Sequence, residues 1–170
     1  NIDSMVAHYT ASKKRRSEDY YSPGCKAGKR PDRACIVYCN RIREAYGDVP
    51  IILGGLEASL RRFAHYDYWD DRVRRSLLVD SRADLLTYGM GENILLRIAE
   101  LLDRGVPVKK IRDVRGSVWM GKAGDAIHFP VAAEFDFNEL KTDKRKYAEA
   151  FGVQYRNQDA INGRALVEYY

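Results

Sequence analysis

Residues 49–59 read VPIILGGLEAS, a short apolar run that meets two glycines and then an acid near the start of a predicted helix. Residues 83–92, ADLLTYGMGE, repeat this layout. Each pattern predicts a buried strand, a turn that needs glycine, and a helix. In a parallel α/β sheet, turns of this kind line the crevice at the carboxyl ends of the strands, where ligands bind. The two stretches therefore predict where a site lies but not what it binds.

Helical periodicity surrounds both strands, most clearly over residues 32–46, where Asp32 is the expected cap and Gly47 the expected end. Between the strands, the sequence predicts a loop over residues 65–71 and helical turns from Arg72 onward. Alternation of helix and buried strand favours an α/β fold with a doubly wound, mostly parallel, Rossmann-like sheet.

We expect three parts along the chain. Residues 1–116 form the Rossmann-like domain, whose first strand would precede this sequence, so that the chain is a piece of a longer protein. Residues 117–130 form a small hairpin linker, with predicted strands at 117–120 and 126–129. Residues 131–170 form a helical extension without a core of its own, which leads to an absent domain.

Composition limits the class of protein. The chain has 170 residues, 45% hydrophobic and 31% charged, as in an ordinary soluble globular domain. None of its apolar runs approaches the roughly 20 residues of a membrane span, so we expect no membrane partner. Three cysteines, an odd number, argue against a disulfide framework. They favour a reducing, cytoplasmic location.

The net charge of +5 is unevenly spread over three basic clusters. The first comprises Lys13, Lys14, Arg15 and Arg16, the second Lys26, Lys29, Arg30 and Arg33, and the third Arg72, Arg74 and Arg75. With Tyr20 and Tyr21 between them, the first two suit RNA or another polyanion, because cations meet phosphates and rings stack on bases. The alternative, which we favour, is a set of solvated loops with acids close by.

Six residues of the two turns form the candidate cofactor-binding crevice. They are Gly54, Gly55, Glu57, Gly89, Gly91 and Glu92. Glycine allows the backbone to approach a ligand, and the helix N-terminus behind it carries partial positive charge. The two acids have two equally supported interpretations: they complement the helix dipole, or they direct polar groups into the crevice.

The aromatic stretch after the first turn is a candidate substrate-binding rim. Its candidate residues are His65, Tyr66, Asp67 and Trp69. Asp67 could orient His65 as an acid or base. The alternative, which we favour, is a structural hydrogen bond that packs this loop.

The spacing of the cysteines does not favour a metal site. Cys35 and Cys39 have the first spacing of a radical S-adenosylmethionine (SAM) cluster motif, but Ile42 occupies the position of the third thiol. Both thiols also lie on the apolar stripe of the predicted helix, where cysteine is usually a small hydrophobe. We expect no metal ligands in this chain.

Residues 49–69, VPIILGGLEASLRRFAHYDYW, resemble the N-terminal region of the YgiQ-type family, an uncharacterised radical SAM protein family. Residues 29–34 (KRPDRA), 79–81 (VDS) and 111–115 (IRDVR) fit it too, so the resemblance covers nearly all of the chain. The glycine turns and residues 116–129 are also similar to the cobalamin-binding-type domain that precedes many radical SAM domains.

The resemblance implies that the intact protein carries a 4Fe–4S cluster on a CxxxCxxC loop and cleaves SAM to a radical. That loop would lie downstream of Tyr170, so the resemblance places no catalytic residue in this chain and implies that the chain alone is inactive. It also makes cobalamin a candidate ligand of the crevice, although the aspartate–histidine motif that would ligate cobalt is not found in this stretch.

We therefore expect the N-terminal domain of a radical SAM enzyme, which shapes a substrate or cofactor crevice against a downstream radical SAM domain of the same chain. The sequence names neither the substrate nor the oligomeric state. One alternative is a basic module that binds RNA or another polyanion beside an enzyme. Another is a domain that only packs against the barrel.

Overall fold

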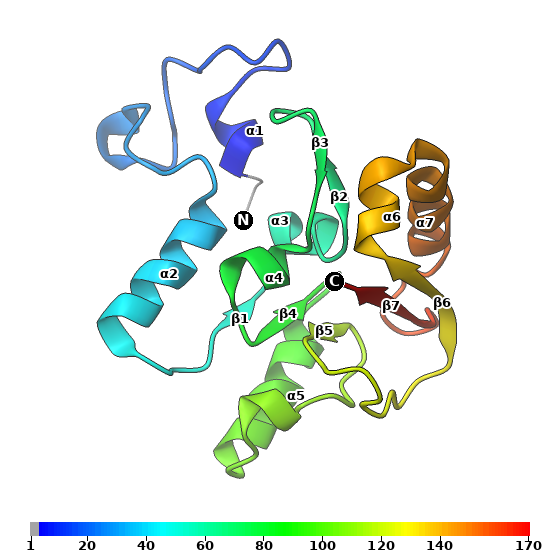
Figure 1. Ribbon diagram of the computed structural model, residues 1–170. Helices are drawn as coiled ribbons and strands as arrows, with labels where there is room; N and C mark the ends of the chain where they lie inside the picture. Colours follow the sequence, from blue (N-terminus) through cyan, green and yellow to red (C-terminus); the bar gives the residue numbers. More distant parts are fainter. Residues whose placement is uncertain (1–3) are drawn as a thin grey trace.

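The computed structural model describes residues 4–170 and centres on a small three-stranded sheet (Figure 1). Strand β4 (Leu85–Thr87) lies in the middle, parallel to β1 (Ile52–Leu53) and antiparallel to β5 (Ser117–Trp119). The protein is α/β as expected, but a doubly wound, mostly parallel sheet is not confirmed. The amide of Tyr88 donates to the carbonyl of Gly116 at the carboxyl end of β4 (3.0 Å). Because β5 starts beside that end, it runs back antiparallel.

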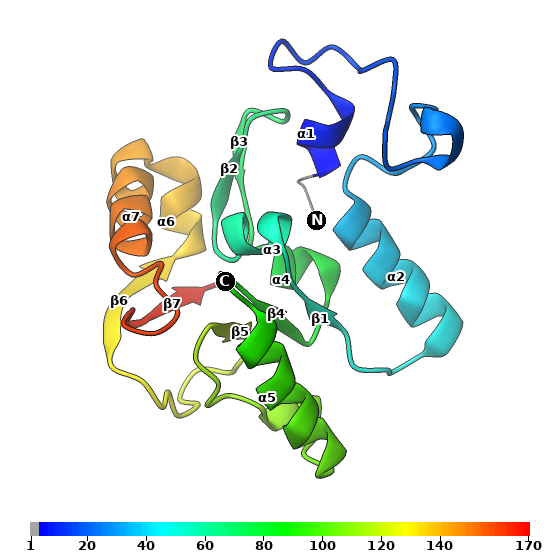
Figure 2. The same cartoon turned by 180° about the vertical axis from the view of Figure 1, so that it is seen from behind.

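Helices cover both faces of this sheet, as Figures 1 and 2 show. Leu86 of β4 packs into one cluster with Cys39 and Leu78, whereas the preceding Leu85 packs into another with Ile94 and Ile98. Successive residues of a strand point to opposite faces, so β4 supplies both clusters. The covering helices are α2 (Ala34–Tyr46), α3 (Leu56–Leu60) and α4 (Leu77–Ser81) around the first cluster, and α5 (Glu92–Asp103) at the second.

Helix α2 confirms the long helix predicted after the basic clusters. It ends at Gly47, whose φ of 66° favours glycine. The predicted cap is wrong, because the residue before the helix is Arg33 and it makes no side-chain cap. The carboxylate of Asp32 instead accepts a hydrogen bond from the hydroxyl of Tyr9 (2.7 Å).

The stretch predicted as a loop over residues 65–71 contains a hairpin strand. Strand β2 (His65–Asp67) pairs antiparallel with β3 (Arg72–Arg74). One carboxylate oxygen of Asp67 accepts from the amides of Trp69 (3.0 Å) and Asp70 (3.2 Å), which closes the turn. Asp side chains stabilise turns in this way, and the turn brings the two short strands together.

Helix α4 is shorter than predicted, because β3 takes the residues from Arg72 onward. The side chain of Ser76 accepts from the amide of Leu78 (3.1 Å) and caps the helix. The helix is therefore restricted to the residues after this serine.

The predicted hairpin over residues 117–130 is also wrong. Residues 117–119 form β5, which pairs with β4, and residues 126–129 are not a strand. The carboxylate of Asp125 accepts from the amide of Lys122 (2.7 Å), so the glycine-rich connection folds as a local turn. Because β5 pairs with the edge of β4, it does not pair with residues 126–129 as the hairpin prediction required.

The C-terminal part contains two strands that the sequence did not predict. Strand β6 (Val131–Asp136) pairs parallel with β7 (Ala165–Tyr169), and helices α6 (Phe137–Thr142) and α7 (Lys144–Arg156) connect them. The sequence predicts a helix over residues 142–151 with Thr142 or Asp143 as its cap. The cap of α7 is Asp143, whose carboxylate accepts from the amides of Arg145 and Lys146. The expected helical extension is therefore a β-α-α-β unit.

This unit has a core that it shares with the β2–β3 hairpin. Ala64, Leu140 and Ala150 are buried together, and Val73 and Phe135 pack against them. The cluster joins residues from before and after position 130. The division of the chain into three domains stays a prediction.

The N-terminal region begins with α1 (Ser4–His8) and is held by ion pairs. His8 is buried, and its ring nitrogens lie 3.7 Å from Asp19 and 3.2 Å from Asp32. Arg30 also donates to Asp19 (2.7 Å). The sequence predicts a short helix over residues 2–9, of which residues 2 and 3 lie outside the described residues. Two 3-10 turns complete the elements: η1 (Pro23–Cys25) and η2 (Val108–Lys110).

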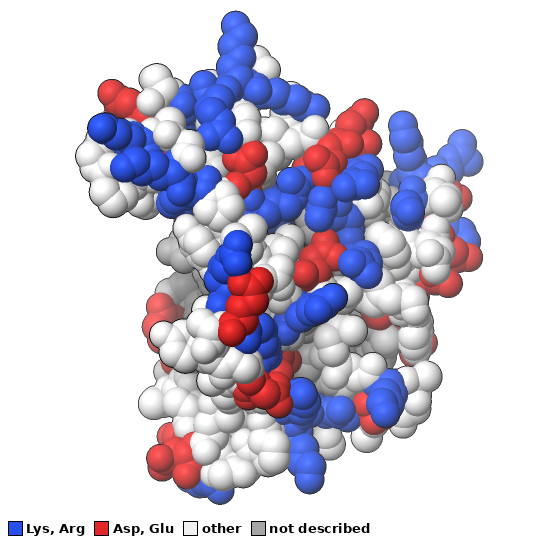
Figure 3. Space-filling model, turned by 60° about the vertical axis from the view of Figure 1, so that its left-hand side comes forward, with Lys and Arg blue, Asp and Glu red and all other residues white. Residues whose placement is uncertain are grey.

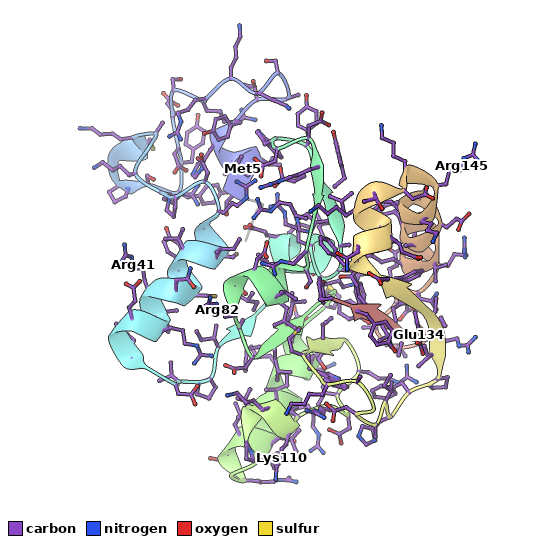
Figure 4. The ribbon with its side chains drawn as sticks, viewed as in Figure 1. Met5, Arg41, Arg82, Lys110, Glu134 and Arg145 are labelled. Atoms are coloured by element: carbon purple, nitrogen blue, oxygen red, sulfur yellow. The ribbon has the colours of Figure 1, made fainter. Side chains whose placement is uncertain are left out.

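Figure 4 shows the side chains of Arg41 on α2 and Arg145 on α7 projecting from the outside of the molecule, whereas Met5 of α1 is buried. Among residues 4–170, no helix combines the length and the apolar character that crossing a membrane requires. The cytoplasmic location stays a prediction.

Candidate functional site

The two glycine turns lie side by side, because β1 and β4 are parallel neighbours and both turns follow their carboxyl ends. One hydroxyl joins them: Ser59 donates to the carbonyl of Gly55 (2.9 Å) and accepts from the amide of Gly89 (3.2 Å). The two glycine turns are therefore joined as one local structure by residues that are 30 positions apart, and the crevice between them stays a prediction.

Both turns require glycine, for different reasons. Gly55 has φ 89° and ψ −173°, and Gly89 has φ 73°, conformations that other residues adopt only with strain. Gly54 has an ordinary φ, but a Cβ there would lie 3.0 Å from the hydroxyl of Thr87. Gly91 has φ −83°, and a Cβ there would make an ordinary contact with the same hydroxyl at 3.6 Å. Three of the four predicted glycines thus have a backbone or packing reason.

The two acids of the turns have different surroundings. Glu57 is buried, and its carboxylate accepts from the amide (3.2 Å) and hydroxyl (2.7 Å) of Ser4 and from the thiol of Cys35 (3.4 Å). It therefore joins α3 to α1 and α2. Glu92 is exposed on the first turn of α5. Only Glu92 has a carboxylate directed to solvent, so the two residues are not equivalent.

The predicted rim forms the β2–β3 hairpin, whose central carboxylate is structural. The side chain of Asp67 is fully buried and accepts from Arg33 (2.5 Å), and Arg74 lies 3.8 Å away. Burial alone would raise the pKa of Asp67, but the hydrogen bond from Arg33 and the turn amide of Asp70 lower it below the ordinary value. Asp67 thus anchors the hairpin to the start of α2.

His65 does not form the acid–base pair with Asp67, which was the less favoured of the two interpretations. Its Nδ1 lies 3.2 Å from the carbonyl of Phe63, and its Nε2 is buried without a hydrogen-bond partner among the described residues. Burial lowers the pKa of His65 to about 4, so the ring is neutral at pH 7. The indole Nε1 of Trp69 is likewise buried and unpaired within residues 4–170, whereas the side chain of Tyr66 is exposed. The four residues share one hairpin without forming an acid–base pair.

The structure also contains a cavity of about 440 Å³ that the sequence did not indicate. Residues of β5, of the turn after it and of β7 line the cavity, and Figures 1 and 2 show β5 and β7 near one another. None of the ten predicted site residues lines it. Its lining residues are spread over positions 62 to 170 and follow no regular spacing in the sequence. The only sequence feature that could have indicated the cavity is its content of arginine and aromatic residues.

Three arginines of this cavity stack on aromatic rings. Arg62 lies 4.7 Å from the ring centre of Tyr88, Arg112 lies 4.7 Å from that of Trp119, and Arg115 lies 4.8 Å from that of Phe129. Such contacts contribute most where the cation is removed from water. The cavity therefore has walls that are both aromatic and positive.

The Radical SAM N-terminal family matches the whole chain, residues 1–170. The chain belongs to this family. It is 56% identical over 172 residues to a UPF0313 protein of Clostridium botulinum (strain Okra / Type B1). It is 54% identical over 168 residues to a UPF0313 protein of Clostridium perfringens (strain ATCC 13124). Both alignments cover 99% of this chain, which spans 26% and 25% of the length of these relatives. No solved structure matches.

These relationships confirm the expected membership of an uncharacterised radical SAM family. The Radical SAM N-terminal domain described here spans about a quarter of the curated relatives that it matches. The glycine turns and the β2–β3 hairpin, which carried the resemblance, both lie within the matched range.

The thiols of this domain do not fit an iron–sulfur cluster. Burial first, and then the carboxylate of Glu57, raise the pKa of Cys35 to about 12, and burial raises that of Cys39. A cluster ligand must be a thiolate, which this environment opposes. Cys25 is exposed in a separate 3-10 turn. Among residues 4–170, no group of three His, Cys, Asp or Glu side chains could hold a metal ion.

The glycine turns also lack a ligand for cobalt. The three histidines of the chain lie on α1, on β2 and in the loop before β6, and none is in a turn after β1 or β4. His8 is already held between two carboxylates. The described residues therefore do not fit a cobalamin that is ligated by a histidine of the crevice.

Proposed function

We propose that this chain is the N-terminal domain of a longer radical SAM enzyme. The observation that carries the proposal is the match of the Radical SAM N-terminal family to all 170 residues. The relatives are about four times as long as this chain, which leaves room for a downstream domain that holds the 4Fe–4S cluster and SAM. The poor fit of Cys35 and Cys39 to a cluster agrees with this division.

In this proposal, the domain shapes one wall of a crevice for a substrate or cofactor. The bridging hydroxyl of Ser59 and the conformations of Gly55 and Gly89 support this role, because they hold two turns together at the carboxyl ends of parallel strands. Glu92 offers an exposed carboxylate at the same edge. The β2–β3 hairpin forms the rim that faces the downstream domain.

The test is the content of iron and sulfide per chain in the full-length protein, purified without oxygen, together with an assay for SAM cleavage. We expect a nearly stoichiometric cluster and formation of 5′-deoxyadenosine. The control is a variant in which the downstream cluster cysteines are replaced by alanine. Failure to bind a cluster after reconstitution would overturn the proposal.

A second candidate function is the binding of a polyanion by the N-terminal region. Figure 3 shows Lys and Arg side chains gathered over this region. Arg15, Arg30 and Arg33 are held by carboxylates, which supports the structural alternative. Within residues 4–170, the side chains of Lys14 and Lys26 have no ion pair, and Tyr20 and Tyr21 are 78% and 63% exposed.

The polyanion candidate is tested by titrating a single-stranded RNA into the full-length protein at several salt concentrations. Binding that weakens steeply with salt, and weakens further on joint replacement of Lys14, Lys26 and Lys29 by alanine, would support it. The control is the same replacement of Lys144 and Lys141 at the opposite end of the chain. No binding at low salt would exclude it.

A further inference from the structure

Arg62 is an unusual residue of the cavity, because its charge is buried without a carboxylate partner. The residue is 8% exposed. Its guanidinium donates to the carbonyl of Ser59 (2.6 Å) and stacks on Tyr88, and no carboxylate within residues 4–170 pairs with it. Burial lowers its pKa, which means that the surroundings oppose the charge. A buried charge of this kind is costly unless an anion compensates it.

A second guanidinium near the same tyrosine also lacks a carboxylate. Arg115 donates only to the carbonyls of Ile161 (3.0 Å) and Gly163 (3.1 Å) among the described residues. Arg62, Tyr88 and Arg115 all line the cavity. Burial raises the pKa of Tyr88, the two guanidinium groups act to lower it, and Asp159 acts to raise it. Two positive groups without a carboxylate partner among the described residues therefore line the same cavity.

The carboxylates of the cavity are already occupied. Asp125 pairs with Arg112 (3.0 Å). Glu168 accepts from the amide of Ala64 (2.9 Å) and from the hydroxyl of Tyr170, and burial raises its pKa. Five cationic side chains line the cavity against these two acids: Arg62, Arg112, Arg115, Lys122 and Arg164. The excess of positive charge favours an anionic occupant.

The remaining walls suit a flat apolar body. Phe63, Tyr88, Trp119 and Phe129 all line the cavity, and rings of this kind bind planar groups by stacking. The volume of about 440 Å³ lies within the usual range of small-molecule sites.

We propose that this cavity binds a small planar anion, in which an aromatic ring system carries a carboxylate or a phosphate. The ring lies among the aromatic side chains, and the anionic group approaches the guanidinium groups of Arg62 and Arg115. This site is distinct from the glycine turns and does not depend on radical chemistry. Its test can therefore fail or succeed whatever the cluster assay shows.

The test is calorimetric titration of the full-length protein with two matched pairs of probes. The first pair is 1-naphthoate and 1-naphthamide, and the second is adenosine 5′-phosphate and adenosine. In at least one pair, we expect the anion to bind tenfold to a hundredfold more tightly than its neutral partner, since a charge-assisted hydrogen bond contributes about 1.5–3 kcal/mol. The pair that responds distinguishes a carboxylate from a phosphate.

Arg62→Gln should remove this preference for the anion, whereas Arg97→Gln should retain it. Arg97 is an exposed arginine of α5 whose partner is Glu100, so it is a matched control outside the cavity. If Arg62→Gln does not fold, Arg115→Gln provides the same test from an exposed residue. Equal affinity for the charged and neutral probes, affinity that neither cavity variant changes, or no binding of any probe would overturn the proposal.

Discussion

The turn after β1 and the turn after β4 have the same local layout and different surroundings. In both, a strand leads through glycine to a helix with an acid in its first turn. Glu57 of the first turn is buried beneath α1 and α2, where Ser4 and Cys35 donate to it. Glu92 of the second turn faces solvent.

The difference shows that one short pattern can have two physical roles. Strand, glycine and helix follow from local geometry, whereas the role of the acid depends on what the rest of the chain places against it. At the first turn, residues of α1 and α2 donate hydrogen bonds to the buried carboxylate, so the acid holds the helices together. At the second turn, nothing among the described residues covers it, and the acid remains available to a ligand.

The largest expected effect concerns the thiol beside Glu57. A pKa of about 12 for Cys35 means that its thiolate fraction at pH 8 is lower than that of an ordinary cysteine by roughly a thousandfold. Alkylation by iodoacetamide, followed by mass spectrometry, should therefore be far slower at Cys35 than at the exposed Cys25. The rate at Cys35 should continue to rise with pH above 10. Equal rates at the two cysteines would contradict the buried contact.

Glu57→Ala should destabilise the domain by about 3 kcal/mol, because it leaves the buried donors of Ser4 without an acceptor. The matched change Glu92→Ala should cost less than about 1 kcal/mol, the usual contribution of an acid at a helix N-terminus. Hydrogen exchange of the α2 and α3 amides in the full-length protein measures both. Similar costs for the two variants would mean that the turns are equivalent after all.

The glycines provide a second matched pair. Gly55→Ala should cost about 2 kcal/mol, because φ 89° with ψ −173° is a conformation that only glycine adopts easily. Gly91→Ala should change the free energy of unfolding by less than about 0.5 kcal/mol, since its φ of −83° suits any residue. The urea midpoints of the two full-length variants measure these stabilities. A larger loss of stability for Gly91→Ala than for Gly55→Ala would contradict the prediction.

The smallest expected effect concerns the connection between the turns. Ser59→Ala removes the hydroxyl that joins Gly55 to Gly89 and should cost about 1 kcal/mol. Faster hydrogen exchange at the amide of Gly89, with no change at α5, would agree with this role. Unchanged exchange at that amide would show that the two turns are held together by the sheet alone.

The best predicted elements are those with a strong local signal. The helix predicted after the second glycine turn is α5, and Gly47 lies at the end of α2 as predicted. The least well predicted elements are β3, β6 and β7. They are short strands in charged stretches, and they are stabilised mainly by pairing with another strand. The supposed hairpin at residues 117–130 failed for the same reason, since β5 pairs with β4 rather than with its neighbour.

The candidate site shows the same limit. The glycine turns were found because glycine has a conformational signature that is visible in the sequence. The cavity was not found, because Arg62, Tyr88 and Trp119 have no fixed spacing and meet only when β5 and β7 are in place. The sequence also did not show that His65 and Asp67 have different partners. In the folded protein, the ring of His65 lies beside a backbone carbonyl, whereas the carboxylate of Asp67 accepts from Arg33.

The sequence by itself determined the family, the two strand–glycine–helix units and the absence of a cluster motif around Cys35 and Cys39. These properties depend on residue identity and short-range spacing. Only the tertiary structure decided that the central sheet is mixed, that Glu57 is a structural contact, and that a positive, aromatic cavity lies beside β5 and β7. The physical reason is that burial and charge pairing depend on segments far apart in the chain, and a local pattern contains no information about which of them meet.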